Sequence, residues 1–97
     1  NIGMRKFFYR VTDGDDIMSI ASRFGVSAFS LVADNELIKE PSEGDVLFVY
    51  VREGTRYKIT PYDSLKSIAE KFSVTPFEIR SKNGNIPYVF YGTEIII

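Results

Sequence analysis

The chain has 97 residues, of which 44% are hydrophobic and 14% aromatic, and its formal net charge is −1. This composition can supply a folded core and is not typical of a disordered chain. The near-zero charge gives no attraction to nucleic acid or to an anionic membrane surface, so we expect neither as a partner. No apolar run reaches the roughly 20 residues of a membrane-spanning helix, and membrane insertion is not expected.

The sequence contains neither cysteine nor histidine. This excludes disulfides, thiolate nucleophiles, the usual zinc ligands and the usual general base. A catalytic site would have to be built from carboxylates, lysine, serine or tyrosine alone. We therefore expect no enzyme activity, no metal and no cofactor.

The first residues do not form a typical secretory signal. Met4 opens a short basic and apolar stretch, but Tyr9 and Arg10 follow where an apolar region would continue. Residues 1–3, which precede Met4, resemble an expression scar derived from a vector.

The chain contains one unit twice, at a constant spacing of 48 residues (57 − 9 = 48 for the first tyrosine pair). A period in this range is typical of an array of small supersecondary units. We predict two tandem units, residues 7–51 and 56–97, joined by a linker at 52–55. The positions that are identical to their partners in the second copy are Tyr9, Thr12, Asp15, Ser19, Ile20, Ala21, Phe24, Val26, Phe29, Asn35, Ile38 and Gly44.

Each unit is predicted to open with a short strand, at residues 7–12 and 56–60. A turn follows, Asp13-Gly14 in the first copy and Pro61-Tyr62 in the second. The acidic and hydroxyl side chains after the turn are typical helix N-caps; these are Asp15, Asp16, Asp63 and Ser64.

The next segment carries apolar residues at i, i+3, i+4 and i+7, which form one face of an α-helix. The helix is expected to stop near Gly25 in the first copy and Ser73 in the second. We predict that the apolar face lies in the core of each unit. Its members are Ile17, Ile20, Ala21 and Phe24, and then Leu65, Ile68, Ala69 and Phe72.

A second helix is expected from Ser27 or Thr75 to Asn35 or Asn83, where asparagine tolerates a left-handed C-cap. Residues 75–78 combine a capping box with proline at the first helical position. After an irregular loop, the last strands are predicted at 46–51 and 94–97. The fold class is therefore α+β, with two βααβ units, each with two short helices and a two-stranded sheet that is more often antiparallel.

Two features predict that the units pack together or against another chain, for example in a homodimer. Residues 46–51 are apolar on both faces of their strand. Phe29 and Leu31 lie roughly 200° apart around a helix, so both cannot enter one core. Phe77 repeats the position of Phe29.

The repeated pattern resembles a lysin motif (LysM). The first copy reads Tyr9-x-Val11-x-x-Gly14-Asp15-Asp16-Ile17-x-x-Ile20-Ala21-x-x-Phe24-Gly25-Val26-Ser27, with Leu31, Asn35, Gly44 and Leu47, and the second copy is similar. Together the copies cover the chain from about Phe7 to Ile97. The resemblance implies a module that binds N-acetylglucosamine-containing glycans, such as peptidoglycan or chitin, in a shallow groove.

The resemblance also implies the two walls of that groove. One wall is the turn after the first strand with the start of the first helix, and the other is the loop between the second helix and the second strand. On this chain the first groove comprises Asp13, Gly14, Asp15, Asp16, Ile17, Asn35, Leu37, Ile38 and Pro41. The second comprises Pro61, Tyr62, Asp63, Ser64, Leu65, Asn83, Asn85, Ile86 and Val89.

Each copy departs from the family pattern in one wall. Tyr62 stands where the family usually has glycine, and Pro41 stands three residues before Gly44, where an apolar residue is usual. If only one copy binds glycan through the turn, we expect it to be the first, because its Gly14 is intact.

Some of these residues also have simpler interpretations. Residues 13–16 form either a capped turn or a capped turn that contacts glycan; a calcium loop is disfavoured because Phe24 falls at position twelve. Asn35 and Asn83 are either helix caps or ligand contacts. The aromatic residues of the second loop either stack on sugar rings or pack between the units; they are Tyr88, Phe90 and Tyr91.

These observations predict a non-catalytic carbohydrate-binding module of a bacterial cell-wall or spore-surface protein. The alternative is a structural or assembly protein, for example of a spore coat, in which degenerate units serve protein–protein contact.

Overall fold

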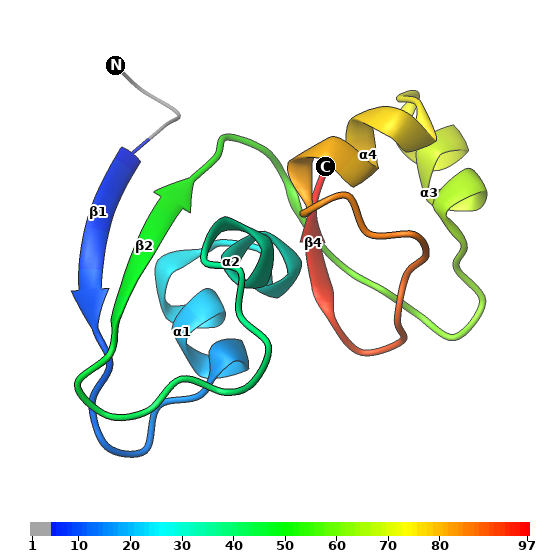
Figure 1. The fold of residues 1–97 in the computed structure, drawn as a ribbon. Helices are drawn as coiled ribbons and strands as arrows, with labels where there is room; N and C mark the ends of the chain where they lie inside the picture. Colours follow the sequence, from blue (N-terminus) through cyan, green and yellow to red (C-terminus); the bar gives the residue numbers. More distant parts are fainter. Residues whose placement is uncertain (1–4) are drawn as a thin grey trace.

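The computed structural model of the chain describes residues 5–97, so the proposed expression scar at residues 1–3 lies outside the described residues. In chain order the elements of the first unit are β1 (Arg5–Arg10), α1 (Ile17–Phe24), α2 (Ala28–Asp34) and β2 (Val46–Val51). Those of the second unit are β3 (Arg56–Lys58), α3 (Leu65–Phe72), α4 (Pro76–Lys82) and β4 (Glu94–Ile96). The predicted α+β class with two βααβ units is confirmed (Figure 1).

Each unit has one antiparallel two-stranded sheet, β1–β2 and β3–β4. The predicted first strand, 7–12, is displaced towards the N-terminus, because β1 covers residues 5–10. Val11 still pairs, but with the turn before β2: its N–H donates to the Asp45 carbonyl (2.7 Å) and its carbonyl accepts from the Gly44 N–H (2.8 Å). Ile59 makes the same exchange in the second unit, so the regular strand ends early there too.

The start and end of α1 and α3 follow local capping rules. Asp16 and Ser64 are the N-caps, and each forms a capping box with a serine three residues later. The helices end at Gly25 (φ 71°) and Ser73 (φ 59°), which both adopt the left-handed conformation. Thr75 caps α4 through the predicted capping box.

Asn35 and Asn83 are the C-caps of α2 and α4, as predicted, but the left-handed conformation expected for them is wrong. Their φ angles are −111° and −129°, and the left-handed residues come next, at Glu36 (φ 50°) and Gly84 (φ 71°). The asparagine side chains instead tie helix to strand. The amide of Asn35 donates to the carbonyls of Leu31 (3.0 Å) and Phe48 (2.8 Å), and its oxygen accepts from the Phe48 N–H (2.7 Å).

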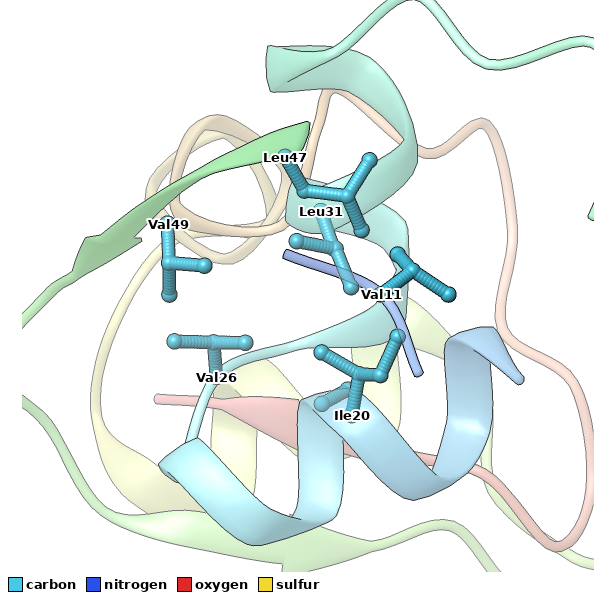
Figure 2. Packing of buried hydrophobic residues seen from close by; sticks show 7 residues of the cluster. Val11, Ile20, Val26, Leu31, Leu47 and Val49 are labelled. Atoms are coloured by element: carbon cyan, nitrogen blue, oxygen red, sulfur yellow. The ribbon is translucent and has the colours of Figure 1, made fainter. Parts of the chain in front are cut away.

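Each unit has its own hydrophobic core between its helices and its sheet. In the first unit the predicted helical face supplies buried Ile20 and Ala21, with Leu31 from α2 and Leu47 from β2 (Figure 2). Fully burying a side chain of this size stabilises the fold by about 1.5–3 kcal/mol. The second core comprises Ile59, Ile68, Ala69, Ile79, Ile86 and Ile95.

The two units are in contact through α2. Phe29 packs against the second core and stacks on Phe90 with ring centroids 5.6 Å apart. The Ser30 hydroxyl donates to the Lys82 carbonyl at 2.8 Å. Gly84 permits this approach, because a Cβ there would lie 2.5 Å from the Phe29 carbonyl oxygen. Phe29 therefore packs against the core of the second unit, whereas Leu31 lies in the core of the first.

The linker is held at both ends. Arg52 donates two hydrogen bonds to Asp34 on α2, at 3.0 and 3.2 Å. Thr55 and Ile97 exchange backbone hydrogen bonds of 3.2 and 2.8 Å, which extend the second sheet. Gly54 has a φ of 155° and lies against Ile96 and Ile97, where a side chain would not fit.

The sheet and helices of the first unit and those of the second unit are stacked in the same order. Figure 1 shows α1 and α2 between the β1–β2 sheet and the second unit, and β4 between α2 and the helices α3 and α4. The outer face of the second sheet therefore meets the first unit, whereas the outer face of the first sheet points away from the second unit. The second apolar face of β2 consequently does not account for the contact between units.

Within residues 5–97 no single helix is long and apolar enough to cross a membrane. Only α1 and α2 together reach that length and apolarity, as a pair bent by 108°.

Candidate functional site

The segment predicted to form the first wall of the groove in the first unit is a tight turn between β1 and α1. The Asp15 N–H donates to the Thr12 carbonyl at 3.1 Å, and Gly14 between them has a φ of 88°. This is the φ of the third residue of a type II turn. Asp13 and Gly14 are exposed, while Asp16 and Ile17 begin α1 as its N-cap and first residue.

The equivalent turn of the second unit has different chemistry. It closes with the same hydrogen bond, from the Asp63 N–H to the Thr60 carbonyl (3.1 Å). Tyr62 replaces Gly14 but is not among the residues with positive φ. Pro61 before it suits a type I turn, in which no residue needs a positive φ. Because types I and II differ in the orientation of their middle peptide, the two turns expose different backbone groups.

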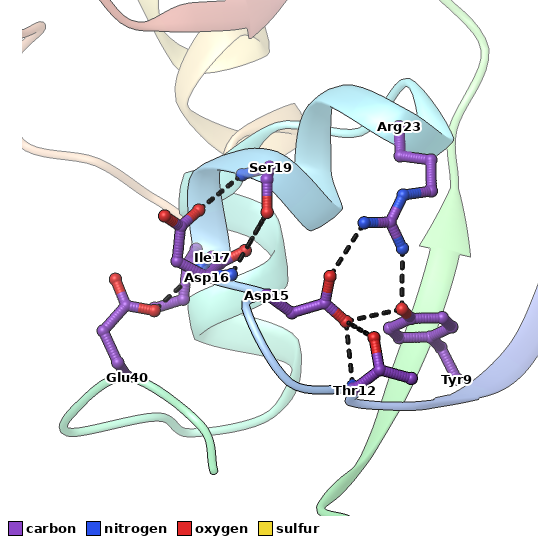
Figure 3. A network of polar contacts seen from close by, with 8 residues as sticks. All are labelled: Tyr9, Thr12, Asp15, Asp16, Ile17, Ser19, Arg23 and Glu40. Atoms are coloured by element: carbon purple, nitrogen blue, oxygen red, sulfur yellow. Dashed lines mark hydrogen bonds and ion pairs between the residues drawn. The ribbon is translucent and has the colours of Figure 1, made fainter. Parts of the chain in front are cut away.

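Asp15 lies at the centre of a polar network beneath the turn (Figure 3). One carboxylate oxygen accepts from the Tyr9 hydroxyl (2.5 Å) and from the backbone N–H and hydroxyl of Thr12 (2.9 and 3.0 Å). The other accepts from Arg23 at 2.8 Å, and Arg23 also donates to the Tyr9 hydroxyl (2.6 Å). The Asp15 side chain is only 6% exposed.

These contacts stabilise the ionised form of Asp15. The hydrogen bond from Tyr9, followed by those from Thr12 and Arg23, holds the pKa of Asp15 well below its ordinary value. The carboxylate in turn raises the pKa of Arg23. Asp15 therefore fixes the turn against α1, and its oxygens already have partners.

Asp63 repeats this role in the second unit. Its carboxylate accepts from the Tyr57 hydroxyl (2.7 Å) and from Thr60 (2.8 and 3.0 Å), and these bonds, led by the Thr60 N–H, lower the pKa of Asp63. The cation differs: Lys71 donates to the Tyr57 hydroxyl (3.0 Å), which raises the pKa of Lys71. The second network thus lacks the arginine bond that Asp15 receives.

A carboxylate from the second predicted wall of the first unit bonds to the first predicted wall. The Ile17 N–H, at the N-terminus of α1, donates to Glu40 Oε1 at 2.8 Å (Figure 3). Glu40 lies in the α2–β2 loop, so this bond joins the two walls that the sequence predicted. The first N–H groups of a helix have no partner inside the helix and attract oxygen acceptors. Tyr88 occupies the equivalent position in the second unit and carries no carboxylate.

Some of the other residues predicted for the first groove pack against the core, and others are exposed to solvent. Leu37 and Ile17 pack against the core, and Asn35 ties α2 to β2. Ile38 is 95% exposed, and Pro41 is half-buried. In the loop, the side chains of Ile38 and Glu40 are therefore exposed to solvent.

The second groove is divided in the same way. Ile86 is buried in the core, with Leu65 and Val89 packed against it, and Asn83 is fully buried as a helix-to-strand tie. Asn85 is exposed and has a left-handed φ of 58°. The accessible residues are Pro61, Tyr62, Ser64 and Asn85, and the side chain of Tyr62 is 93% exposed.

Of the two alternatives for the aromatic residues of the second loop, the structure shows packing between the units for Phe90, and sugar stacking stays a prediction. Phe90 stacks on Phe29 of the first unit, so it packs between the units. Tyr88 lies edge-on to Phe90, with centroids 4.8 Å apart, but is 58% exposed. Tyr91 is 73% exposed. Tyr88 and Tyr91 thus keep surface for a ligand.

Sequence reasoning missed Glu40 and the roles of Tyr9 and Arg23. A usable signal existed for the network, because a tyrosine and a cation recur 14 residues apart in both copies, as Tyr9 with Arg23 and Tyr57 with Lys71. Glu40 had no such signal, since its partner is a backbone N–H 23 residues away. Among residues 5–97, no group of three or more acidic side chains is arranged to hold a metal ion.

Comparison with known proteins gives one family and several similar structures. The LysM domain family matches the sequence twice, at residues 9–49 and 57–97. The crystal structure of the Bacillus cereus spore cortex-lytic enzyme SleL is 25% identical over 96% of this chain and 23% of that chain, with a TM-score of 0.46. The crystal structure of the Bacillus megaterium QM B1551 spore cortex-lytic enzyme SleL is 27% identical over 93% of this chain and 22% of that chain, with a TM-score of 0.46.

The chain therefore matches less than a quarter of the length of these two enzymes. The comparison with curated proteins gives no match.

Proposed function

The chain belongs to the LysM domain family, and we propose that it binds N-acetylglucosamine-containing glycans of the peptidoglycan or chitin type without catalysing a reaction. LysM domains in general bind such glycans and are binding modules rather than catalytic ones. The proposed contacts are the exposed groups of the two grooves, while Asp15, Asn35, Asp63 and Ile86 hold the walls in place.

The bond between Ile17 and Glu40 is the observation that best supports this function. It reveals a backbone N–H that lies between the two walls and already binds an oxygen acceptor, at 2.8 Å. The carbonyl oxygen of an N-acetyl group or a sugar hydroxyl offers the same kind of acceptor. We infer that a sugar in the first groove displaces the Glu40 side chain and takes over this N–H.

The turn beside this N–H suits close contact with a ligand. Gly14 has no side chain, and even a Cβ placed there would meet nothing within 4 Å. Backbone groups of residues 13–14 are therefore accessible to a sugar ring. The exposed Asp13 carboxylate adds an acceptor for sugar hydroxyls.

The second groove offers aromatic surface instead. Tyr62 and Tyr88 are 93% and 58% exposed, on the turn and the loop respectively. Aromatic rings combine an apolar face with a polar tip, which suits the mixed surface of a sugar. We propose that this groove binds glycan mainly through these rings.

The electrostatics of the carboxylates argue against glycoside hydrolysis. A general acid in such an enzyme needs a raised pKa. The pKa values of Asp15 and Asp63 are both lowered by the hydrogen bonds that they accept. These two groups therefore stay ionised and serve as structural acceptors.

A glycan ligand of this class would place the protein at a bacterial cell wall or spore surface, where peptidoglycan is the abundant polymer. The direct test is retention of the purified chain on insoluble peptidoglycan and on chitin, followed by titration with N-acetylglucosamine oligomers under NMR. We expect the Ile17 N–H signal to shift on titration. Absence of retention on both polymers, with no shift at millimolar oligomer, would exclude this function.

Matched variants assign the binding to the grooves. Tyr88→Ala removes a half-exposed ring from the second loop, and Phe77→Ala removes an equally exposed ring (66%) from α4, outside both grooves. We expect the first to weaken retention and the second to leave it unchanged.

A second function, protein–protein contact in an assembly, is favoured by a separate observation. The outer face of the first sheet carries Phe8, 73% exposed, opposite Phe48. Such an aromatic face on the side away from the second unit serves neither groove.

A further inference from the structure

We propose that two copies of this chain stack head to tail, with the outer face of the β1–β2 sheet of one copy docked on the α3–α4 surface of the next. The arrangement repeats the one inside the chain, where the first unit's helices meet the second unit's sheet (Figure 1). The proposal does not depend on glycan binding.

The contact inside the chain provides the template. On the sheet side, the Arg56 guanidinium donates to the Ser22 carbonyl of α1 at 3.4 Å, and Ile96 on the outer face is only 4% exposed. On the helix side, Phe29 is the projecting ring, and it packs against the second unit. A cavity of about 280 Å³ between Met18, Ala28, Lys58 and Gly92 shows that this contact is not tightly filled.

At one end of the molecule, no part of residues 5–97 covers the equivalent sheet surface. We call this the sheet end; its residues are Lys6, Phe8, Arg10, Val46 and Phe48, which the register places on the outer face. Phe8 and Phe48 occupy the positions of Arg56 and Ile96, and their ring centroids are 5.6 Å apart. Val46 beside them is 50% exposed. The uncovered face is thus more apolar than the covered one.

The opposite end presents the equivalent helix surface. We call this the helix end; it comprises Glu70, Val74, Phe77, Glu78 and Ser81. Phe77 corresponds to Phe29 but is 66% exposed instead of packed. Beside it lies a hollow of about 110 Å³ lined by Val74, Glu78, Ile79, Ser81, Lys82 and Ile97. In the first unit, Val26 and Ser30 at the positions of Val74 and Glu78 face the second unit.

Charge disfavours contact between two sheet ends. The sheet end carries the cations Lys6 and Arg10. The helix end has Glu70 and Glu78, which can pair with these cations, but it also carries Lys66 and Lys82, so its charges are of both signs. Two sheet ends facing each other would bring like charges together, which disfavours a symmetric dimer.

The intermolecular contact matches the internal one in its faces but not atom by atom. Glu36 stands at the position of Gly84, whose missing side chain allows the close approach to the Phe29 carbonyl. The stacked copies must therefore sit further apart than the two units do. The aromatic rings of Phe8 and Phe48 extend from the sheet into that wider space.

A contact between two different ends does not close on itself in a dimer. Each added copy leaves one sheet end and one helix end open, so growth continues unless the stack closes into a ring. Sedimentation velocity of the full chain over a concentration series tests this directly. We expect species that grow beyond the dimer as concentration rises; a monomer at every concentration would overturn the proposal.

Complementary variants test the polarity of the stack. Phe8→Glu disables the sheet end and Phe77→Glu disables the helix end, so each variant alone should remain monomeric. Mixing them leaves one intact pair of ends, and the mixture should form a one-to-one dimer that does not grow. A dimer that Phe8→Glu abolishes and Phe77→Glu preserves would overturn the head-to-tail arrangement in favour of sheet-to-sheet pairing.

Two controls separate this proposal from folding defects and from glycan binding. Circular dichroism should give native spectra for both variants, and Phe8→Ser provides a second, milder change at the sheet end that should also block growth.

Tyr62→Glu alters a ring that is 93% exposed at the second groove, and we expect it to leave growth of the stack intact while it weakens glycan retention. Both phenylalanine variants should retain glycan, so failure of one proposal leaves the other measurable.

Discussion

The first and second units have equivalent helices and an equivalent aspartate beneath the turn, but they differ in the surfaces around them. The second sheet presents Arg56, Lys58, Glu94 and the buried Ile96 on its outer face, and that face lies against the first unit across a cavity. The first sheet presents Phe8 and Phe48, and that face points away from the second unit. The outer face next to the other unit is thus mostly polar around the buried Ile96, whereas the outer face of the first sheet is mostly aromatic and aliphatic between Lys6 and Arg10, so the two sheets offer different surfaces for contact.

The grooves diverged as well. The first has a glycine turn and a carboxylate, Glu40, that occupies the helix N–H. The second has Tyr62 and Tyr88 in the equivalent positions. A repeat preserved in its core and altered in both walls shows that folding constrains the core while the surface is free to specialise. Measurements on paired variants can test how far this separation holds.

The largest expected difference in the free energy of unfolding is between substitutions of the two equivalent asparagines, Asn35 and Asn83. Asn83 is 0% exposed and bonds to the backbone of Ile79 and Ile96, whereas Asn35 makes the same bonds in a partly exposed site. Asn83→Ala leaves buried backbone groups without partners and should cost about 3 kcal/mol. Asn35→Ala should cost about 1–2 kcal/mol, because water can replace part of the loss. Thermal unfolding followed by circular dichroism measures both, and equal losses would contradict the difference in burial.

The next comparison uses the two equivalent phenylalanines. Phe29 packs against the second core, whereas Phe77 is 66% exposed. Phe29→Ala should cost about 2 kcal/mol, less than for a fully buried ring, and should uncouple the two units. Phe77→Ala should change stability by under about 0.5 kcal/mol. Denaturant unfolding at low concentration, where copies do not associate, measures the two values. A similar cost for both would show that the contact between units contributes little.

The repeat made much of this architecture predictable. Caps, helical apolar faces and turn residues act over a few positions, so Asp16, Gly25 and the capping box at Thr75 could be assigned from local sequence. The strand limits were less predictable, because Val11 pairs with a turn and not with a strand.

Longer-range choices were not predictable. Both faces of β2 are apolar, so the pattern could not indicate that one face would lie on the unit's own helices and the other would point away from the second unit. The bond from Ile17 to Glu40 depends on the path of a loop and on one side-chain rotamer. The assignment of groove residues to glycan contacts stays a prediction.

Acid should distinguish the two carboxylate networks. The folded pKa values of Asp15 and Asp63 lie below those of the unfolded chain, so their stabilising contribution is complete above about pH 4 and is lost as the pH falls through the folded pKa. Asp15→Asn should therefore flatten the fall in Tm between about pH 4 and pH 2. Asp63→Asn should flatten the fall in Tm less. Asp15 accepts a hydrogen bond from Arg23 at 2.8 Å, whereas Lys71 in the second unit bonds to Tyr57. Identical profiles for the two variants would contradict a special role for Arg23.

The smallest expected effect is an exchange of groove chemistry at equivalent positions. Glu40→Tyr removes the carboxylate that occupies the Ile17 N–H at 2.8 Å. A single exposed hydrogen bond contributes about 1 kcal/mol, so a competing sugar should bind the first groove about fivefold more tightly. The reverse change, Tyr88→Glu, removes a ring that is 58% exposed and introduces a carboxylate, and it should weaken the second groove. NMR titration with N-acetylglucosamine oligomers, following the Ile17 and Leu65 N–H signals separately, gives an affinity for each groove. Unchanged affinity at the first groove after Glu40→Tyr would mean that sugar and Glu40 do not compete for this N–H.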